Sequence, residues 1–142
     1  MSNSVTNHRG ERPARVPAGL AAMAAVIAGG LVGSGMRAAA LLRWPAAPGA
    51  FPVSTLAINL AGAFLLGLFL ARRQRSVAGP RSVQFWAIGV LGSFTTFSLF
   101  SLEIFELLDG GHAAVGLAHA AASTLGGVAL AILGARLGEV GQ

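Results

Sequence analysis

The sequence predicts an all-α integral membrane protein with four transmembrane helices. Of its 142 residues, 54% are hydrophobic and only 11% are charged, whereas a soluble domain carries about 25% charged residues. Its mean hydropathy is +0.70. Four uncharged apolar runs are each long enough to cross a hydrocarbon core as a helix. The composition therefore excludes an ordinary soluble domain.

Cysteine and charge exclude further classes of protein. Cysteine is absent, which rules out a disulfide framework and thiolate metal sites. The pI near 11.8 does not indicate a nucleic-acid partner, because the arginines lie between the apolar runs instead of gathering on one face. No nucleophile–base pair, phosphate-binding loop or cluster of metal ligands stands out, so we do not expect an enzyme.

The spans follow one another with short connections. We expect them at about 16–36, 52–71, 82–105 and 113–135, within a single domain of residues 16–138. Residues 1–15 are polar and predict a disordered cytoplasmic tail. A cleaved signal peptide is the alternative for this arginine-rich start.

Arginine sets the expected orientation. With four spans, eight of the ten arginines share one side of the membrane. They are Arg9, Arg12, Arg15, Arg72, Arg73, Arg75, Arg81 and Arg136. The other side has Arg37 and Arg43, together with the acidic Glu103, Glu106 and Asp109. The positive-inside rule places both termini in the cytoplasm, in one fixed orientation.

Small residues recur at four-residue spacing in the first and last spans. Gly29 and Gly33 form one pair, and Gly134 and Gly138 form another. Such pairs let helix backbones approach closely in lipid, where no hydrophobic force draws helices together. We interpret these glycines as helix-packing residues.

Asn59 lies in the middle of the second span, far from any charge in the sequence. Thr55 and Gly62 share its helical face. A buried amide must find hydrogen-bond partners. It either bonds a backbone carbonyl of a neighbouring helix or donates to a permeating ion, and the sequence leaves both interpretations open.

The third run carries glycine and hydroxyl residues at its centre, in GVLGSFTTFSLF. We expect the helix to break there, because a break at membrane depth is tolerated where the freed backbone meets protein or an ion. Carbonyls freed around Gly92–Thr95 would suit a small hard cation. Phe97 and Phe100 share a face, and their electropositive ring edges could contact an anion. The alternative is an unbroken helix with back-bonded hydroxyls and rings in lipid.

Three further polar residues are less specific. Glu103 and Glu106 are expected at the membrane interface, with a vestibule as the alternative for Glu103. His119 is interpreted as a hydrogen-bonded packing residue. Arg37, at the expected end of the first helix, would reach the headgroups or cap carbonyls.

Three segments carry a family resemblance. GGLVGSGMR, PVSTLAINLAGAFLLG and GVLGSFTTFSLFSLEIF resemble, in this order, the signatures of the CrcB/Fluc family of fluoride channels. The resemblance implies four-helix subunits paired in antiparallel orientation in a bacterial-type plasma membrane. Two narrow pores would pass fluoride and reject chloride.

The resemblance also implies roles for single residues of the pore. Asn59 matches the pore asparagine, and Phe97 and Phe100 match the two rings whose edges contact fluoride. Ser98 matches a hydroxyl beside these rings. We add Thr55 to the expected pore, because it shares the face of Asn59.

Outside the pore, the resemblance implies a structural sodium ion that is not transported. Gly92 and Thr95 match the positions whose backbone carbonyls hold it at the dimer centre. Arg37 matches the arginine at the end of helix one.

Two departures from the family pattern favour a heterodimer. Leu99 replaces the second hydroxyl of the usual TTFST, and the expected hydroxyl track of helix four falls on Ala121, Gly127 and Ala131. The pore would therefore lack donors on that side. With the fixed orientation, this predicts pairing with a paralogous subunit of opposite orientation, and impairment of one of the two pores is a further hypothesis.

Fluoride would leave the cell passively, driven by the negative-inside potential at about 2.3 kcal/mol per charge per 100 mV. No ATP-binding motif is visible. Two alternatives stay open. A small four-helix drug or cation exporter would need a membrane carboxylate for proton coupling, and a non-conducting assembly subunit would need no pore.

Overall fold

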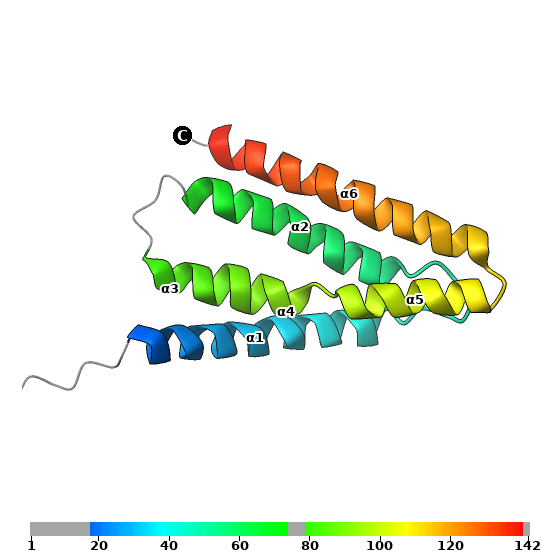
Figure 1. The fold of residues 1–142 in the computed structure, drawn as a ribbon, viewed down its shortest axis with the longest axis horizontal. Coiled ribbons are helices and arrows are strands. Elements are labelled where there is room, and N and C mark those ends of the chain that lie inside the picture. Colours follow the sequence, from blue (N-terminus) through cyan, green and yellow to red (C-terminus); the bar gives the residue numbers. More distant parts are fainter. Residues whose placement is uncertain (1–17, 74–78, 141–142) are drawn as a thin grey trace, which may run out of the picture.

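The computed structural model describes residues 18–73 and 79–140 (Figure 1). Its elements are α1 (Ala18–Arg43), α2 (Val53–Arg73), α3 (Pro80–Ser82), the π-helix η1 (Val83–Leu91), α4 (Gly92–Phe94), α5 (Phe97–Asp109) and α6 (Ala113–Val140). Every regular element in the described ranges is helical. Four stretches are long and apolar enough to cross a membrane, which confirms the predicted fold class. The expected tail lies outside the described residues.

The helices run further than the apolar runs predicted. The first span continues from the expected end at residue 36 to Arg43, and the last continues from residue 135 to Val140. The residues after Arg37 are alanine and leucine, which favour helix without regard to membrane depth. The end of an apolar run indicates where the chain leaves the membrane core. The helix itself can continue into the polar region beyond that point, so the expected spans were shorter than the helices.

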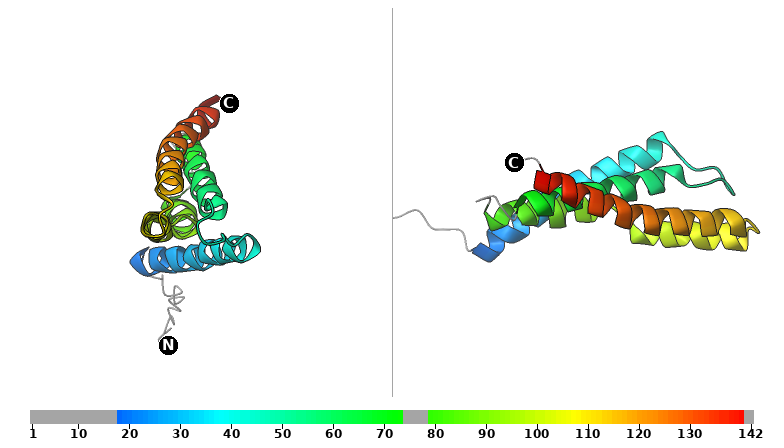
Figure 2. Two further views of the ribbon diagram at one scale, coloured as in Figure 1. Left: turned by 90° about the vertical axis from the view of Figure 1, so that its right-hand side faces the viewer. Right: turned by 90° about the horizontal axis from the view of Figure 1, so that it is seen from above.

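The third span lies between α1 on one side and the α2–α6 pair on the other (Figure 2). α1 packs along η1 and α4, while α6 packs along α2 and reaches α5. The start of α1 and the end of α6 lie at the same end of the bundle (Figure 1). The helix ends that carry Arg72, Arg73, Arg81 and Arg136 lie at this end too. The described arginines are thus segregated as expected, and their cytoplasmic side stays a prediction.

Glycines lie at the contact of α1 with η1 and at the contact of α6 with α2, as the spacing predicted. A Cβ on Gly29 or Gly33 would strike the backbone carbonyls of Phe85 or Val90 in η1. Apolar side chains that are fully buried are few in the described chain, and much apolar surface is exposed. The fold therefore depends on backbone approach in lipid more than on a core.

Replacing Gly134 by valine should destabilise the bundle strongly. A Cβ there would meet the carbonyl of Phe64 in α2, which is backbone and cannot move aside. Overpacking costs about 1–3 kcal/mol and more where the backbone must shift. Thermal unfolding in detergent should show a clearly lower midpoint than for Gly35→Val, since a Cβ on Gly35 meets nothing within 4 Å. Equal midpoints for the two variants would contradict this contact.

Candidate ion pathway at the helix break

The third span is broken at Thr95 and Thr96. Both are extended, with φ −74° and ψ 158° at Thr95 and φ −145° and ψ 120° at Thr96. The predicted break is confirmed, although Gly92 itself keeps helical dihedrals, φ −64° and ψ −29°. The Thr96 hydroxyl caps α5 by accepting from the Leu99 amide at 3.2 Å, a role that threonine commonly fills. The Thr96 hydroxyl also lies 3.3 Å from the hydroxyl of Ser98.

Asn59 of α2 makes two hydrogen bonds to the backbone of Thr96 at the break. Its Nδ2 donates to the Thr96 carbonyl at 3.0 Å, and its Oδ1 accepts from the Thr96 amide at 2.8 Å. In a continuous helix that amide would donate to the Gly92 carbonyl. The interhelical interpretation of Asn59 is therefore confirmed. Its amide group still has a second N–H, and donation from it to a permeating ion stays a prediction.

Arg37 reaches the break from the other side. Its Nη1 donates to the Thr95 carbonyl at 3.1 Å. The expectation that Arg37 lies at the helix end is wrong, because α1 continues to Arg43. The guanidinium does cap a carbonyl, but one freed by the break in the third span instead of one at its own helix end.

Arg37→Gln should destabilise the broken conformation of the third span. The neutral amide replaces a charged donor, and hydrogen bonds to charged groups are worth about 1.5–3 kcal/mol. We expect a lower unfolding midpoint and reduced ion flux, with partial recovery in Arg37→Lys. Arg43→Gln is the control, since Arg43 is exposed and lies over the ring of Trp44. If the two glutamine variants had the same unfolding midpoint and the same flux, the contact of Arg37 with Thr95 would contribute to neither stability nor conduction.

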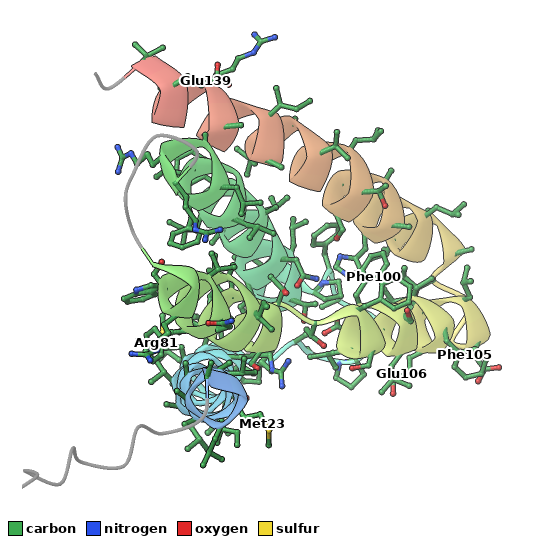
Figure 3. The ribbon with its side chains drawn as sticks, turned by 60° about the vertical axis from the view of Figure 1, so that its left-hand side comes forward. Met23, Arg81, Phe100, Phe105, Glu106 and Glu139 are labelled. Atoms are coloured by element: carbon green, nitrogen blue, oxygen red, sulfur yellow. The ribbon has the colours of Figure 1, made fainter. Side chains whose placement is uncertain are left out.

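The two rings of the expected aromatic pair lie together at the start of α5. The centroids of Phe97 and Phe100 are 5.9 Å apart with the planes tilted by 45°, which confirms their shared face. Phe97 is 80% exposed in the single chain. Phe100 projects toward α6 (Figure 3), where its ring centroid lies 5.3 Å from that of His119.

A pocket of about 370 Å³ lies between α2, the break and α6. Its lining residues carry no formal charge. They are Asn59, Gly62, Ala63, Leu66, Ala87, Leu91, Gly92, Thr95, Thr96, Phe97, Ser123 and Gly127. Of the expected pore residues, Asn59 and Phe97 line this pocket, together with Gly92 and Thr95 of the expected sodium site. Phe100, Ser98 and Thr55 do not line it.

The fourth span, α6, contributes a hydroxyl that was not among the residues expected from the sequence. Ser123 lines the pocket, and its buried Oγ has no partner among the described residues. The expectation that α6 offers no donor is therefore wrong. Of the positions assigned to the hydroxyl track, Gly127 does line the pocket, but Ala121 is exposed and Ala131 packs against Gly67. The spacing of His119, Ser123 and Gly127 on one helical face could have shown this.

Thr55 and Glu103 form a second polar cluster with His119. The Thr55 hydroxyl donates to Glu103 Oε1 at 2.7 Å, and His119 Nε2 lies 3.4 Å from Glu103 Oε2. Thr55 and His119 are fully buried. Glu103 is therefore not simply an interfacial residue. The predicted face of α2 is confirmed, since Thr55, Asn59 and Gly62 all contact the third span.

A larger pocket of about 750 Å³ adjoins this cluster. It is formed mainly by the connection between α1 and α2 and by the second half of α5, and both Glu103 and Glu106 line it. The vestibule alternative for Glu103 fits this placement.

Comparison with known proteins places the chain among related sequences. A family model described as "CrcB-like protein, Camphor Resistance (CrcB)" matches residues 24–135. A protein of Thermus thermophilus named fluoride-specific ion channel FluC is 43% identical over 115 residues, 80% of this chain and 91% of its own. The FluC of Deinococcus radiodurans is 47% identical over 113 residues, 78% of this chain and 89% of its own.

Streptomyces avermitilis has two similar proteins, named FluC 2 and FluC 3. FluC 3 is 41% identical over 119 residues, which cover 83% of this chain and 58% of that relative. FluC 2 is 40% identical over 107 residues, 74% of this chain and 68% of its own. The spans, their order and the family match show a multi-pass membrane protein that belongs to the CrcB family.

Proposed function

We propose that this chain is a subunit of a fluoride-specific channel that lowers cytoplasmic fluoride by passive efflux. One observation carries the proposal beyond the names of the relatives. An amide, an unpartnered hydroxyl and a phenyl ring meet in one uncharged pocket, contributed by Asn59, Ser123 and Phe97.

This donor set suits a small dehydrated anion. Fluoride is tightly hydrated, so a narrow path must replace its water with several weak donors. A lysine or arginine there would bind the ion too tightly to release it, and none lines the pocket. The membrane potential supplies the driving force, about 2.3 kcal/mol per 100 mV, so no energy-coupling site is needed.

A structural sodium ion fits the backbone at the break. The Gly92 carbonyl loses its α-helical donor because the Thr96 amide turns to Asn59. The Thr95 carbonyl accepts from Arg37 and has a second lone pair for a cation. These carbonyls are hard oxygen ligands, and a bound sodium would neutralise their dipoles and stabilise the break.

The proposed assembly is an antiparallel dimer, and we favour a heterodimer. Phe97 is largely exposed in the single chain, so a second subunit is needed to enclose the path. The eight-to-two distribution of arginines in the sequence favours one fixed orientation, which requires an inverted paralogue as the partner. Streptomyces avermitilis shows that relatives coexist in one organism.

Efflux measured with a fluoride electrode tests the proposal. Liposomes that hold the chain together with an inverted paralogue should release fluoride and retain chloride, whereas the chain alone should not conduct. Full flux from the chain alone would contradict the proposed heterodimer but would support the proposed channel function. Absence of fluoride flux from a folded, assembled dimer would overturn the channel itself. Proton-driven release of an organic cation would favour an exporter instead.

A further inference from the structure

The pair formed by Glu103 and His119 is ionisable and unused by the conduction described above, with His119 buried and the side chain of Glu103 only 13% exposed. His119 is fully buried between two rings, with centroid distances of 5.5 Å to Phe51 and 5.3 Å to Phe100. Its Nε2 faces Glu103 Oε2 at 3.4 Å. The other carboxylate oxygen is held by the Thr55 hydroxyl at 2.7 Å, which fixes the carboxylate toward the imidazole.

This pair lies between Phe97, which lines the smaller pocket, and the larger pocket, which Glu103 lines. Phe100 contacts Phe97 on one side and His119 on the other. Glu103 comes one helical turn after Phe100 on α5, and it lines the pocket of about 750 Å³. An anion that passes between the ring pair and this pocket therefore passes the carboxylate.

A bare carboxylate at this point opposes anion flow. Two negative charges repel strongly where the surroundings are less polar than water. One proton shared by Glu103 and His119 removes the net charge of the pair, whichever of the two holds it. Loss of that proton leaves the pair with a net charge of −1 beside the ring pair.

Other ionisable groups at this end of the described chain do not replace that proton. Glu106 lines the same pocket and adds negative charge. The His112 ring lies against Gly49, and Arg43 is exposed beside Trp44. α2 contributes the neutral Thr55, and α6 contributes His119 itself.

We propose that one proton held by the Glu103–His119 pair sets the conductance of the path. Fluoride passes while the pair carries that proton, and flux falls as rising pH on the pocket side removes it. This inference rests on the proposed channel function. It concerns regulation of the same path.

The pH dependence of fluoride efflux tests it, in liposomes that contain the assembled dimer, with empty liposomes as the leak correction. From about pH 6 to about pH 9, a range around and above the ordinary titration of histidine, wild-type flux should fall about tenfold or more. Glu103→Gln should remove this dependence and stay at the high-flux level. Asp109→Asn is the matched control, an exposed carboxylate on α5, and should keep the wild-type profile.

A flat wild-type profile, or a Glu103→Gln profile that still falls, would overturn the proposal. No flux at any pH would instead overturn the channel function. If Glu103→Gln does not fold, the imidazole nitrogen shifts of His119 in the wild-type dimer decide the question. They should titrate over the pH range in which flux falls, and titration outside that range would contradict the shared proton.

Discussion

Phe97→Ile should reduce fluoride flux more than tenfold while the dimer stays folded. Phe97 lines the pocket at the break and pairs with Phe100, so its electropositive ring edge is available to a dehydrated anion. Cations over ring faces gain about 2 kcal/mol in desolvated sites, and we expect the same order of magnitude for an anion at a ring edge. Each 1.36 kcal/mol on a barrier is about tenfold in rate. Isoleucine keeps apolar bulk but removes the ring.

Phe105→Ile is the matched control. Phe105 lies on the same helix, is 64% exposed and does not line the pocket. Fluoride-electrode efflux should therefore be normal in this variant. If Phe97→Ile conducted as well as Phe105→Ile, the ring edge would have no part in permeation, and a role in assembly alone would be favoured.

Asn59→Ala should abolish flux and also lower stability. The substitution leaves the Thr96 amide and carbonyl without the partners they have at 2.8 and 3.0 Å. An unsatisfied buried polar group costs about 1–3 kcal/mol, so we expect a loss of about 2–6 kcal/mol for the two groups. The variant also removes an amide donor from the pocket.

Asn59→Asp places a negative charge at the same point of the path. A carboxylate can still accept from the Thr96 amide, but its other oxygen would face the Thr96 carbonyl to which Asn59 Nδ2 now donates. The variant should therefore be less stable than the wild type, and its charge should exclude fluoride. Ser101→Ala is the control, because its hydrogen bond to the Phe97 carbonyl is exposed. Normal flux in Asn59→Asp, measured alongside the unfolding midpoint, would contradict the placement of Asn59 on the path.

The spans and the helix break could be predicted because they depend on local sequence. Apolar runs identify the four helices, and the polar centre of the third span predicts its break. The break lies at Thr95–Thr96, beyond Gly92, because capping by Thr96 and the Asn59 amide outweigh the flexibility of glycine. That balance depends on a contact between spans, which the third run alone does not contain.

The remaining contacts of the site could not be derived from spacing along one helix. Arg37 finds Thr95, and Glu103 finds His119, only when helices distant in sequence are placed side by side. The π-helical hydrogen bonding of Val83–Leu91 has no recognised pattern in its residues. Ser123 is absent from the expected hydroxyl track, of which only Gly127 lines the pocket, whereas Ala121 and Ala131 do not.

Carbon chemical shifts of Thr95 and Thr96, recorded in lipid bilayers on the assembled dimer, test most directly whether the third span is open at this point. The structure predicts extended-backbone shifts at both residues, between helical shifts at Phe94 and Phe97. Helical shifts across all four positions would show a continuous helix, with no freed carbonyls and no place for Asn59 to bond the backbone, and would contradict the proposed path.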